Sequence, residues 1–117
     1  MKRVAIPISN NKLSEFFGEC EQYEIYDIDS GITGKQSANI PEGINIKELP
    51  DWIEKQGITD VIAYKVNPGI IRLFASKKVN LYVGIQPDSP QKLIDEYLQG
   101  KLESDERVIN ELMNSVL

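Results

Sequence analysis

The sequence contains no histidine and a single cysteine, Cys20. Without histidine, neither an imidazole-based catalytic triad nor a histidine-based zinc site can form. One cysteine excludes an intrachain disulfide, and one thiolate cannot complete an ordinary metal site. Because buried free cysteines are common, we favour a structural role for Cys20 and keep it only as a weak candidate metal ligand.

Long apolar runs and an excess of basic residues are also missing. No stretch approaches the roughly 20 residues that span a bilayer, and the apolar run Val4–Ile8 is too short for a signal peptide. We therefore expect a cytoplasmic protein without membrane contact. Lys and Arg number 13 against 18 Asp and Glu, and this net charge of −5 argues against a nucleic-acid partner.

Nuclease chemistry is excluded as well. Two-metal nucleases need carboxylates that cluster at strand ends. The apolar run Val4–Ile8 carries no carboxylate, and nothing in the pattern pairs Asp27 or Asp29 with Asp60. With no catalytic constellation in view, we expect a protein that is not an enzyme.

The 117 residues, 41% of them hydrophobic, are enough for one domain with one sizeable core. Short apolar runs bounded by turn signals predict strands at 4–8, 22–29, 32–40, 61–64 and 79–83. Helical spacing and capping residues predict helices near 48–56, from Pro68 after Asn67, from Pro90 after Ser89, and over 104–117.

This order of elements predicts an α/β domain with a mixed five-stranded sheet. The first three strands fit a meander, and right-handed crossovers place strand 4 beside strand 1. The resulting sheet order is 3-2-1-4-5, with strand 2 antiparallel. Because open α/β sheets bind ligands where the chain changes direction at strand carboxyl ends, we expect a site between the loops at 9–12 and 64–67.

Candidate ligand-binding residues lie on these loops and next to them. Asn67-Pro68-Gly69 begins a helix whose dipole and free N–H groups favour an anion, and Lys65 adds a positive charge. The alternative is a simple capped helix with a solvated lysine. The candidate set is Ser9, Asn10, Ser14, Phe17, Gly18, Lys65, Asn67, Pro68 and Gly69.

Three segments carry a family pattern. Residues 13–23, Leu-Ser-Glu-Phe-Phe-Gly-Glu-Cys-Glu-Gln-Tyr, are similar to L-S-x-H-F-G-x-C-x-x-F. Residues 49–63 are similar to L-P-x-W-L…G-x-D-V-V-I-A, and residues 95–102 to Y-L-x-G-x-L. Together, from Val4 to about Leu102, they resemble the dinitrogenase iron–molybdenum cofactor biosynthesis family. The resemblance implies a three-layer ribonuclease-H-like domain.

The resemblance also implies a cargo, an anionic iron–molybdenum or iron–sulfur type cluster. The chain departs from the family at functional positions: Phe16 replaces a histidine, residues 64–67 replace a glycine-rich G-G-x-G loop, and residues 105–110 replace a C-terminal Cys/His segment. Two hypotheses follow. The chain is a non-catalytic carrier that binds a cluster or a small anion at the loops after strands 1 and 4. Alternatively, it is a protein-interaction or regulatory module that has lost cluster binding and carries no cofactor.

The C-terminal segment is amphipathic. We divide the chain into a domain at 1–103 and a helix at 104–117. The apolar face of this helix consists of Val108, Ile109, Leu112, Met113, Val116 and Leu117. It packs either on its own domain or on a partner, which is a second copy or another protein.

Overall fold

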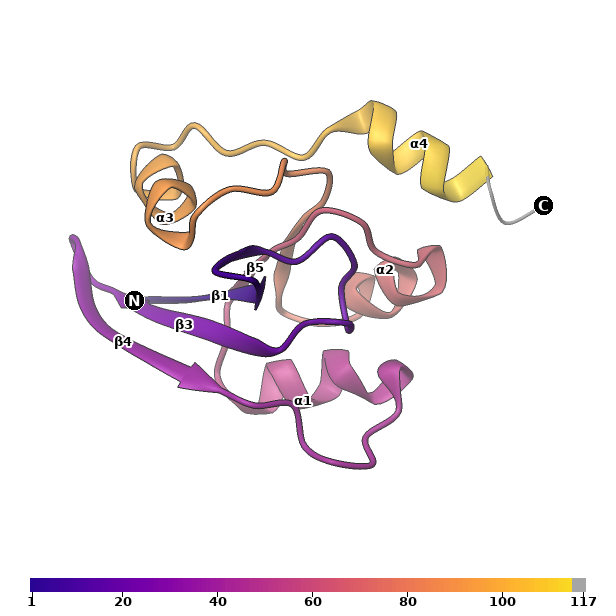
Figure 1. Cartoon of the computed structure of the whole chain (residues 1–117), viewed down its shortest axis with the longest axis horizontal. Coiled ribbons are helices and arrows are strands. Elements are labelled where there is room, and N and C mark those ends of the chain that lie inside the picture. Colours follow the sequence, from indigo (N-terminus) through magenta and orange to yellow (C-terminus); the bar gives the residue numbers. More distant parts are fainter. Residues whose placement is uncertain (115–117) are drawn as a thin grey trace.

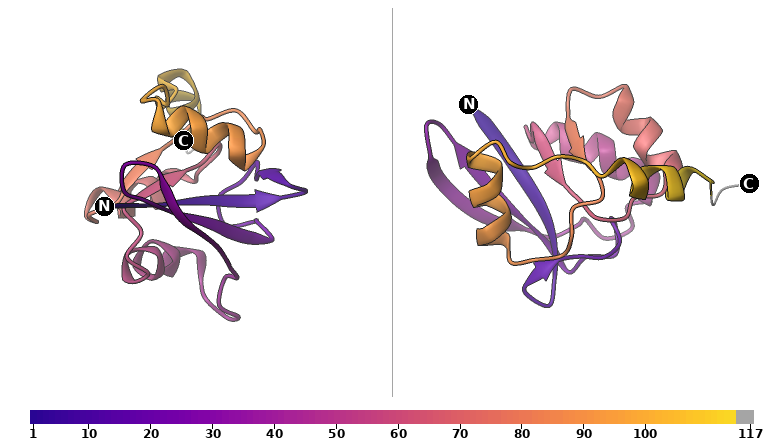
Figure 2. Two further views of the ribbon diagram at one scale, coloured as in Figure 1. Left: turned by 90° about the vertical axis from the view of Figure 1, so that its left-hand side faces the viewer. Right: turned by 90° about the horizontal axis from the view of Figure 1, so that it is seen from above.

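The computed structural model describes residues 1–114. Its strands are β1 (Lys2–Ser9), β2 (Lys12–Leu13), β3 (Gln22–Ile28), β4 (Ile32–Ala38), β5 (Asp60–Ile62) and β6 (Asn80–Tyr82). Its helices are the 3-10 turn η1 (Ile46–Glu48), α1 (Leu49–Lys55), α2 (Pro68–Ala75), α3 (Pro90–Leu98) and α4 (Glu106–Asn114). The sheet lies between α3 on one side and α1 on the other (Figures 1 and 2).

The sheet has the order β4-β3-β1-β5-β6, with β2 paired to β1 off this path. Strand β3 runs antiparallel to β1 and β4, while β5 runs parallel to β1 and β6. The α/β class and the predicted order of the five longer strands are therefore confirmed. The prediction of five strands was wrong in one respect, because β2 makes the sheet six-stranded.

The missed strand belongs to a tight hairpin. Asn10 and Asn11 have positive φ angles of 53° and 64°, and Ser9 pairs with Lys12 across them. Asparagine tolerates this left-handed conformation, and two such residues in succession make the turn that suits a two-residue β-hairpin. The segment predicted as a polar loop at 9–12 is therefore a hairpin tip that projects from the end of β1.

Apolar side chains on both faces of the sheet build two core clusters. Tyr23 and Ile25 point to the face covered by α1 and α2, whereas Tyr26 and Ile28 point to the face covered by α3. The helices contribute buried side chains to these clusters, each worth about 1.5–3 kcal/mol when fully buried. These side chains are Leu49, Ile53, Ile70 and Phe74 on one face and Leu93 and Ile94 on the other.

Two helices begin where the sequence predicted. The Asn67 side chain accepts a hydrogen bond from the Gly69 N–H at the start of α2, with Pro68 in the first turn. The Ser89 side chain accepts one from the Lys92 N–H at the start of α3. Proline fits these positions because the first N–H groups of a helix have no partner within it.

The C-terminal helix α4 lies on the side of the molecule that carries α2 (Figure 1). Ile109 and Leu112 pack against the α1/α2-face cluster, but no residue of α4 is buried. Val116 and Leu117, which the sequence placed on the same apolar face, lie outside the described residues. Among residues 1–114, no helix combines the length and apolarity needed to cross a bilayer.

Candidate functional site

The loops that follow β1, β5 and β6 meet at one edge of the sheet. The Phe17 N–H donates to the Lys65 carbonyl at 2.8 Å, and the Lys65 N–H donates to the Glu15 carbonyl at 3.0 Å. The Gly84 N–H donates to the Tyr64 carbonyl at 2.9 Å. The first two of these backbone hydrogen bonds join residues 15–17, which follow β2, to the predicted loop at 64–67. The predicted loop at 9–12 takes part in none of the three, because it forms the tip of the β1–β2 hairpin.

Two hollows flank this contact, and Phe16 lines both. The first, of about 420 Å³, lies beside the β1–β2 hairpin and includes the predicted residues Ser9, Asn10 and Ser14. The Ser14 hydroxyl donates to the Phe16 carbonyl at 3.1 Å, so it already has a partner within the loop. The side chain of Lys12, a residue that was not predicted, also lines this hollow.

The second hollow, of about 320 Å³, lies at the start of α2. It includes the predicted residues Phe17, Lys65, Asn67 and Pro68. It also includes Val66 of the predicted loop, and three residues that sequence reasoning did not connect with the site, namely Glu19, Ile46 and Leu112. The last of these comes from α4, so segments nearly 100 residues apart in the sequence contribute to this hollow.

The other two candidates lie elsewhere. Gly69 lines a smaller neighbouring hollow of about 290 Å³, together with the apolar side chains of Ile70 and Leu73. Gly18 lines none of these hollows. It has a φ of +94°, and a Cβ there would lie 2.6 Å from Cδ1 of Ile46. Glycine at this position therefore allows close packing against η1.

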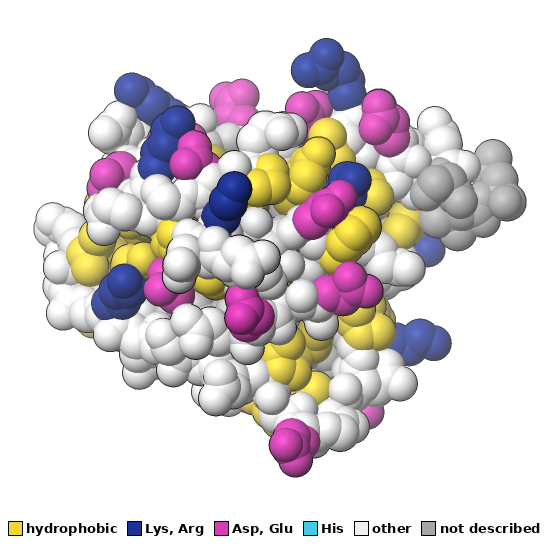
Figure 3. Space-filling model, viewed as in Figure 1, with side chains coloured by type: hydrophobic (Ala, Val, Ile, Leu, Met, Phe, Trp, Pro, Cys, Tyr) yellow, Lys and Arg dark blue, Asp and Glu magenta, His cyan; other side chains and the backbone are white. Residues whose placement is uncertain are grey.

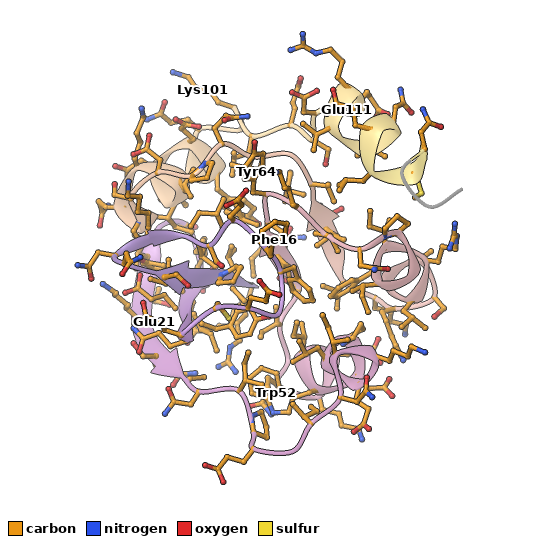
Figure 4. The ribbon with its side chains drawn as sticks, turned by 45° about the vertical axis from the view of Figure 1, so that its right-hand side comes forward. Phe16, Glu21, Trp52, Tyr64, Lys101 and Glu111 are labelled. Carbon is orange, nitrogen blue, oxygen red and sulfur yellow. The ribbon has the colours of Figure 1, made fainter. Side chains whose placement is uncertain are left out.

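Lys65 lies among groups that already satisfy its charge. Its Nζ is 3.0 Å from Oε1 of Glu15 and lies 5.4 Å and 5.3 Å from the ring centroids of Phe16 and Tyr64. The hydrogen bond to Glu15 raises the pKa of Lys65, and the carboxylate of Glu111 raises it further. Lys65 is therefore not the freely solvated lysine of the simpler alternative. Figure 4 shows Phe16 and Tyr64 at the front of the molecule.

The first turn of α2 has little to offer an anion. Pro68 has no N–H, and the Gly69 N–H donates to the Asn67 side chain at 2.8 Å. The N–H groups of Ile70 and Ile71 both donate to the Asn67 carbonyl, at 2.9 Å and 3.1 Å. An anion that binds here has the field of the helix dipole but must compete with Asn67 for the Gly69 donor.

Coordination of a metal–sulfur cluster by side chains does not fit the residues present. Cys20 packs against the α1/α2-face cluster and lines none of the hollows. Burial raises the pKa of its thiol to about 11, so the thiol is protonated at neutral pH. Among residues 1–114, no three Asp, Glu, Cys or His side chains gather in a way that could hold a metal ion.

The charges around the hollows are mixed. Lys12 and Lys65 are accompanied by the carboxylates of Glu15 and Glu19, and the negative charge of Glu111 on α4 raises the pKa of Lys65. Figure 3 shows acidic and basic side chains interspersed among hydrophobic ones in the region of α4. The site can therefore hold a ligand by polar and apolar contacts, with one lysine at each hollow.

Known proteins share both the sequence pattern and the fold. The family described as "Dinitrogenase iron-molybdenum cofactor" matches residues 1–100. An uncharacterised protein of Methanocaldococcus jannaschii is 28% identical over 112 residues, which cover 91% of this chain and 93% of that protein.

Two solved structures have the same architecture. The crystal structure of PH0822 is similar with a TM-score of 0.78 and 25% identity, over 88% of this chain and 96% of that one. A protein of Methanocaldococcus jannaschii that carries a provisional dinitrogenase label has a TM-score of 0.71 and 21% identity, over 88% of this chain and 93% of its own. The second likeness concerns the fold alone.

Proposed function

Because this chain belongs to the dinitrogenase iron–molybdenum cofactor family, whose pattern spans residues 1–100, we propose that it is a non-catalytic binding or carrier protein. The family match confirms the resemblance that three segments of the sequence predicted. The proposed cargo is an anionic species, either a small oxyanion or thioanion or an intact metal–sulfur cluster. It is held without coordination by protein side chains.

One observation supports this proposal above the others. The loops after β1, β5 and β6 converge at the carboxyl edge of the sheet, and the two hollows there are each lined by one lysine, Lys12 or Lys65. Ligands of open α/β sheets bind at this edge because loops from neighbouring strands converge there. An anion that reaches Lys65 replaces the carboxylate of Glu15 as its partner.

The test is a titration of the full chain, purified without air, with tetrathiomolybdate as the probe. We expect a change in the visible spectrum that saturates at about one site, and iron or molybdenum in elemental analysis of the purified protein. Lys65→Met should weaken probe binding because it removes the charge and keeps the aliphatic stem. Lys78→Met, an exposed lysine that lines none of the hollows, is the matched control. Absence of metal together with an unchanged spectrum would contradict the proposal.

A second candidate function is the protein-interaction module. It is favoured by apolar side chains that remain accessible beside the second hollow, since Phe16, Ile46 and Leu73 are 45%, 41% and 38% exposed. We expect such a module to self-associate or to bind a protein, and to be colourless after purification without air. Sedimentation velocity tests self-association. A metal-free chain that stays monomeric at all concentrations would count against this candidate.

A further inference from the structure

Helix α4 lies outside the residues that the family pattern covers, yet it contributes to the second hollow. The family match ends at residue 100, and α4 begins at Glu106. Leu112 lines the hollow together with Phe16, Lys65 and Asn67. Ile109 and Leu112 are half-buried against the α1/α2-face cluster. Helix α4 therefore lies beside the edge where the loops converge and supplies part of the lining of the second hollow.

The segment that leads into α4 is firmly attached. The Asp105 N–H donates to the Val83 carbonyl at 2.8 Å, and the Val83 N–H donates to the Ser104 hydroxyl at 3.0 Å. Gly84 permits this close approach, because a Cβ there would lie 2.7 Å from the Cβ of Asp105. The Asp105 carboxylate in turn accepts a hydrogen bond from the Arg107 N–H at 2.9 Å.

Beyond this attachment the helix is held more lightly. No residue of α4 is buried, and its contacts with the core come from one apolar face. Segments with few buried apolar contacts open with a smaller free energy than the core does. A fixed start at Ser104–Asp105 and a half-buried apolar face give α4 the properties of a hinged element.

The charge on α4 acts against an anion in the second hollow. The carboxylate of Glu111 is near enough to Lys65 to raise its pKa, and Lys65 also pairs with Glu15. Figure 4 shows Glu111 on α4, above Tyr64 and Phe16. With α4 in place, Glu111 adds its negative charge to that of Glu15 near Lys65, the one lysine that lines this hollow, and Leu112 lines the hollow as well.

We infer that α4 is a lid over the second hollow, hinged at Ser104–Asp105, which leaves the hollow when an anionic ligand binds. This inference rests on the proposed function. When only the open form binds, the apparent dissociation constant equals the intrinsic one divided by the open fraction. Changes that loosen α4 therefore strengthen binding, although they remove contacts from the protein.

The experiment compares tetrathiomolybdate affinities of full-length variants. The double change Ile109→Asn and Leu112→Asn weakens the docking of α4, and we expect it to tighten probe binding by about tenfold or more, since it removes two half-buried aliphatic groups. Glu111→Gln should tighten binding by about two- to threefold, and added salt should reduce this gain. Glu106→Gln, an exposed carboxylate in the first turn of α4, is the matched control and should leave affinity unchanged.

Amide hydrogen exchange of the unmodified chain supplies an independent measurement. Probe binding should speed exchange over 106–114 and slow it over 65–70. Slower exchange in both segments would overturn the lid, because α4 would then close on the ligand. Equal affinities for all variants would overturn the lid and leave the proposed function standing. Failure of every chain, including the unmodified one, to bind the probe would overturn both.

Discussion

Gly84→Ala tests the attachment of the C-terminal segment. Gly84 has a φ of +87°, and an added Cβ would lie 2.7 Å from the Cβ of Asp105 and 3.1 Å from that of Val108. Gly100 has a φ of +70° with no atom within 4 Å of the added Cβ, so Gly100→Ala is a matched control for backbone strain alone. We expect the left-handed conformation to cost each variant about 1–2 kcal/mol.

The close contacts at Gly84 add a second cost that the control lacks. Forcing an extra methyl group into a packed site costs about 1–3 kcal/mol, so Gly84→Ala should be less stable than Gly100→Ala by that amount. Urea unfolding followed by the fluorescence of Trp52, the single tryptophan, measures both free energies. Amide exchange over 104–114 shows whether α4 has moved.

One outcome would refute the reasoning. Displacement of α4 would relieve the contact and reduce the difference in unfolding free energy between Gly84→Ala and Gly100→Ala, and faster amide exchange over 106–114 would reveal it. Equal unfolding free energies for the two variants, together with unchanged exchange over 106–114, would show that the C-terminal segment does not pack on Gly84. The lid would then lose its hinge.

Three further predictions concern the core, a helix cap and pH. The Tyr23 hydroxyl is buried with no hydrogen-bond partner among residues 1–114. Tyr23→Phe should therefore leave the unfolding free energy in urea unchanged or raise it by up to about 1 kcal/mol. Tyr26→Phe, which loses a hydrogen bond to the Glu24 carboxylate, should lower it by about 1 kcal/mol. Asn67→Ala should cost about 1 kcal/mol because it removes the N-cap of α2, and Asn67→Asp should restore most of it by the same measurement. Burial raises the pKa of the Cys20 thiol from 9.0 to about 11, so the unfolding free energy should fall as pH rises from about 9 through about 11. In urea unfolding at several pH values, Cys20→Ala should show a shallower fall than the unmodified chain. An equal fall would refute a contribution of Cys20 to this pH dependence.

The sequence determined the elements whose signals are local. Asn67-Pro68 and Ser89-Pro90 fixed the starts of α2 and α3, because a capping side chain bonds to N–H groups only two or three residues away. The apolar run at 22–29 predicted a strand, which is β3 in the structure. The chirality of crossovers then gave the order of the five longer strands.

The strand β2 was missed although its signal is also local. Asn10-Asn11 is a polar pair that suits a loop as well as a hairpin turn, and the two residues of β2 are too few to show a period. Only the pairing of Ser9 with Lys12 distinguishes the two structures. Such pairing depends on backbone angles that the residue types allow but do not impose.

The sequence predicted one site between the loops at 9–12 and 64–67, whereas in the structure these loops line two separate hollows. Sequence reasoning placed the site at the loops after β1 and β5, and it could not foresee that Lys65 pairs with Glu15, 50 residues away. Nor could it foresee that Ile46 and Leu112 line the second hollow. Residue type and spacing specify which face of an element is apolar, whereas the partner that covers this face is set by packing between segments far apart in the chain.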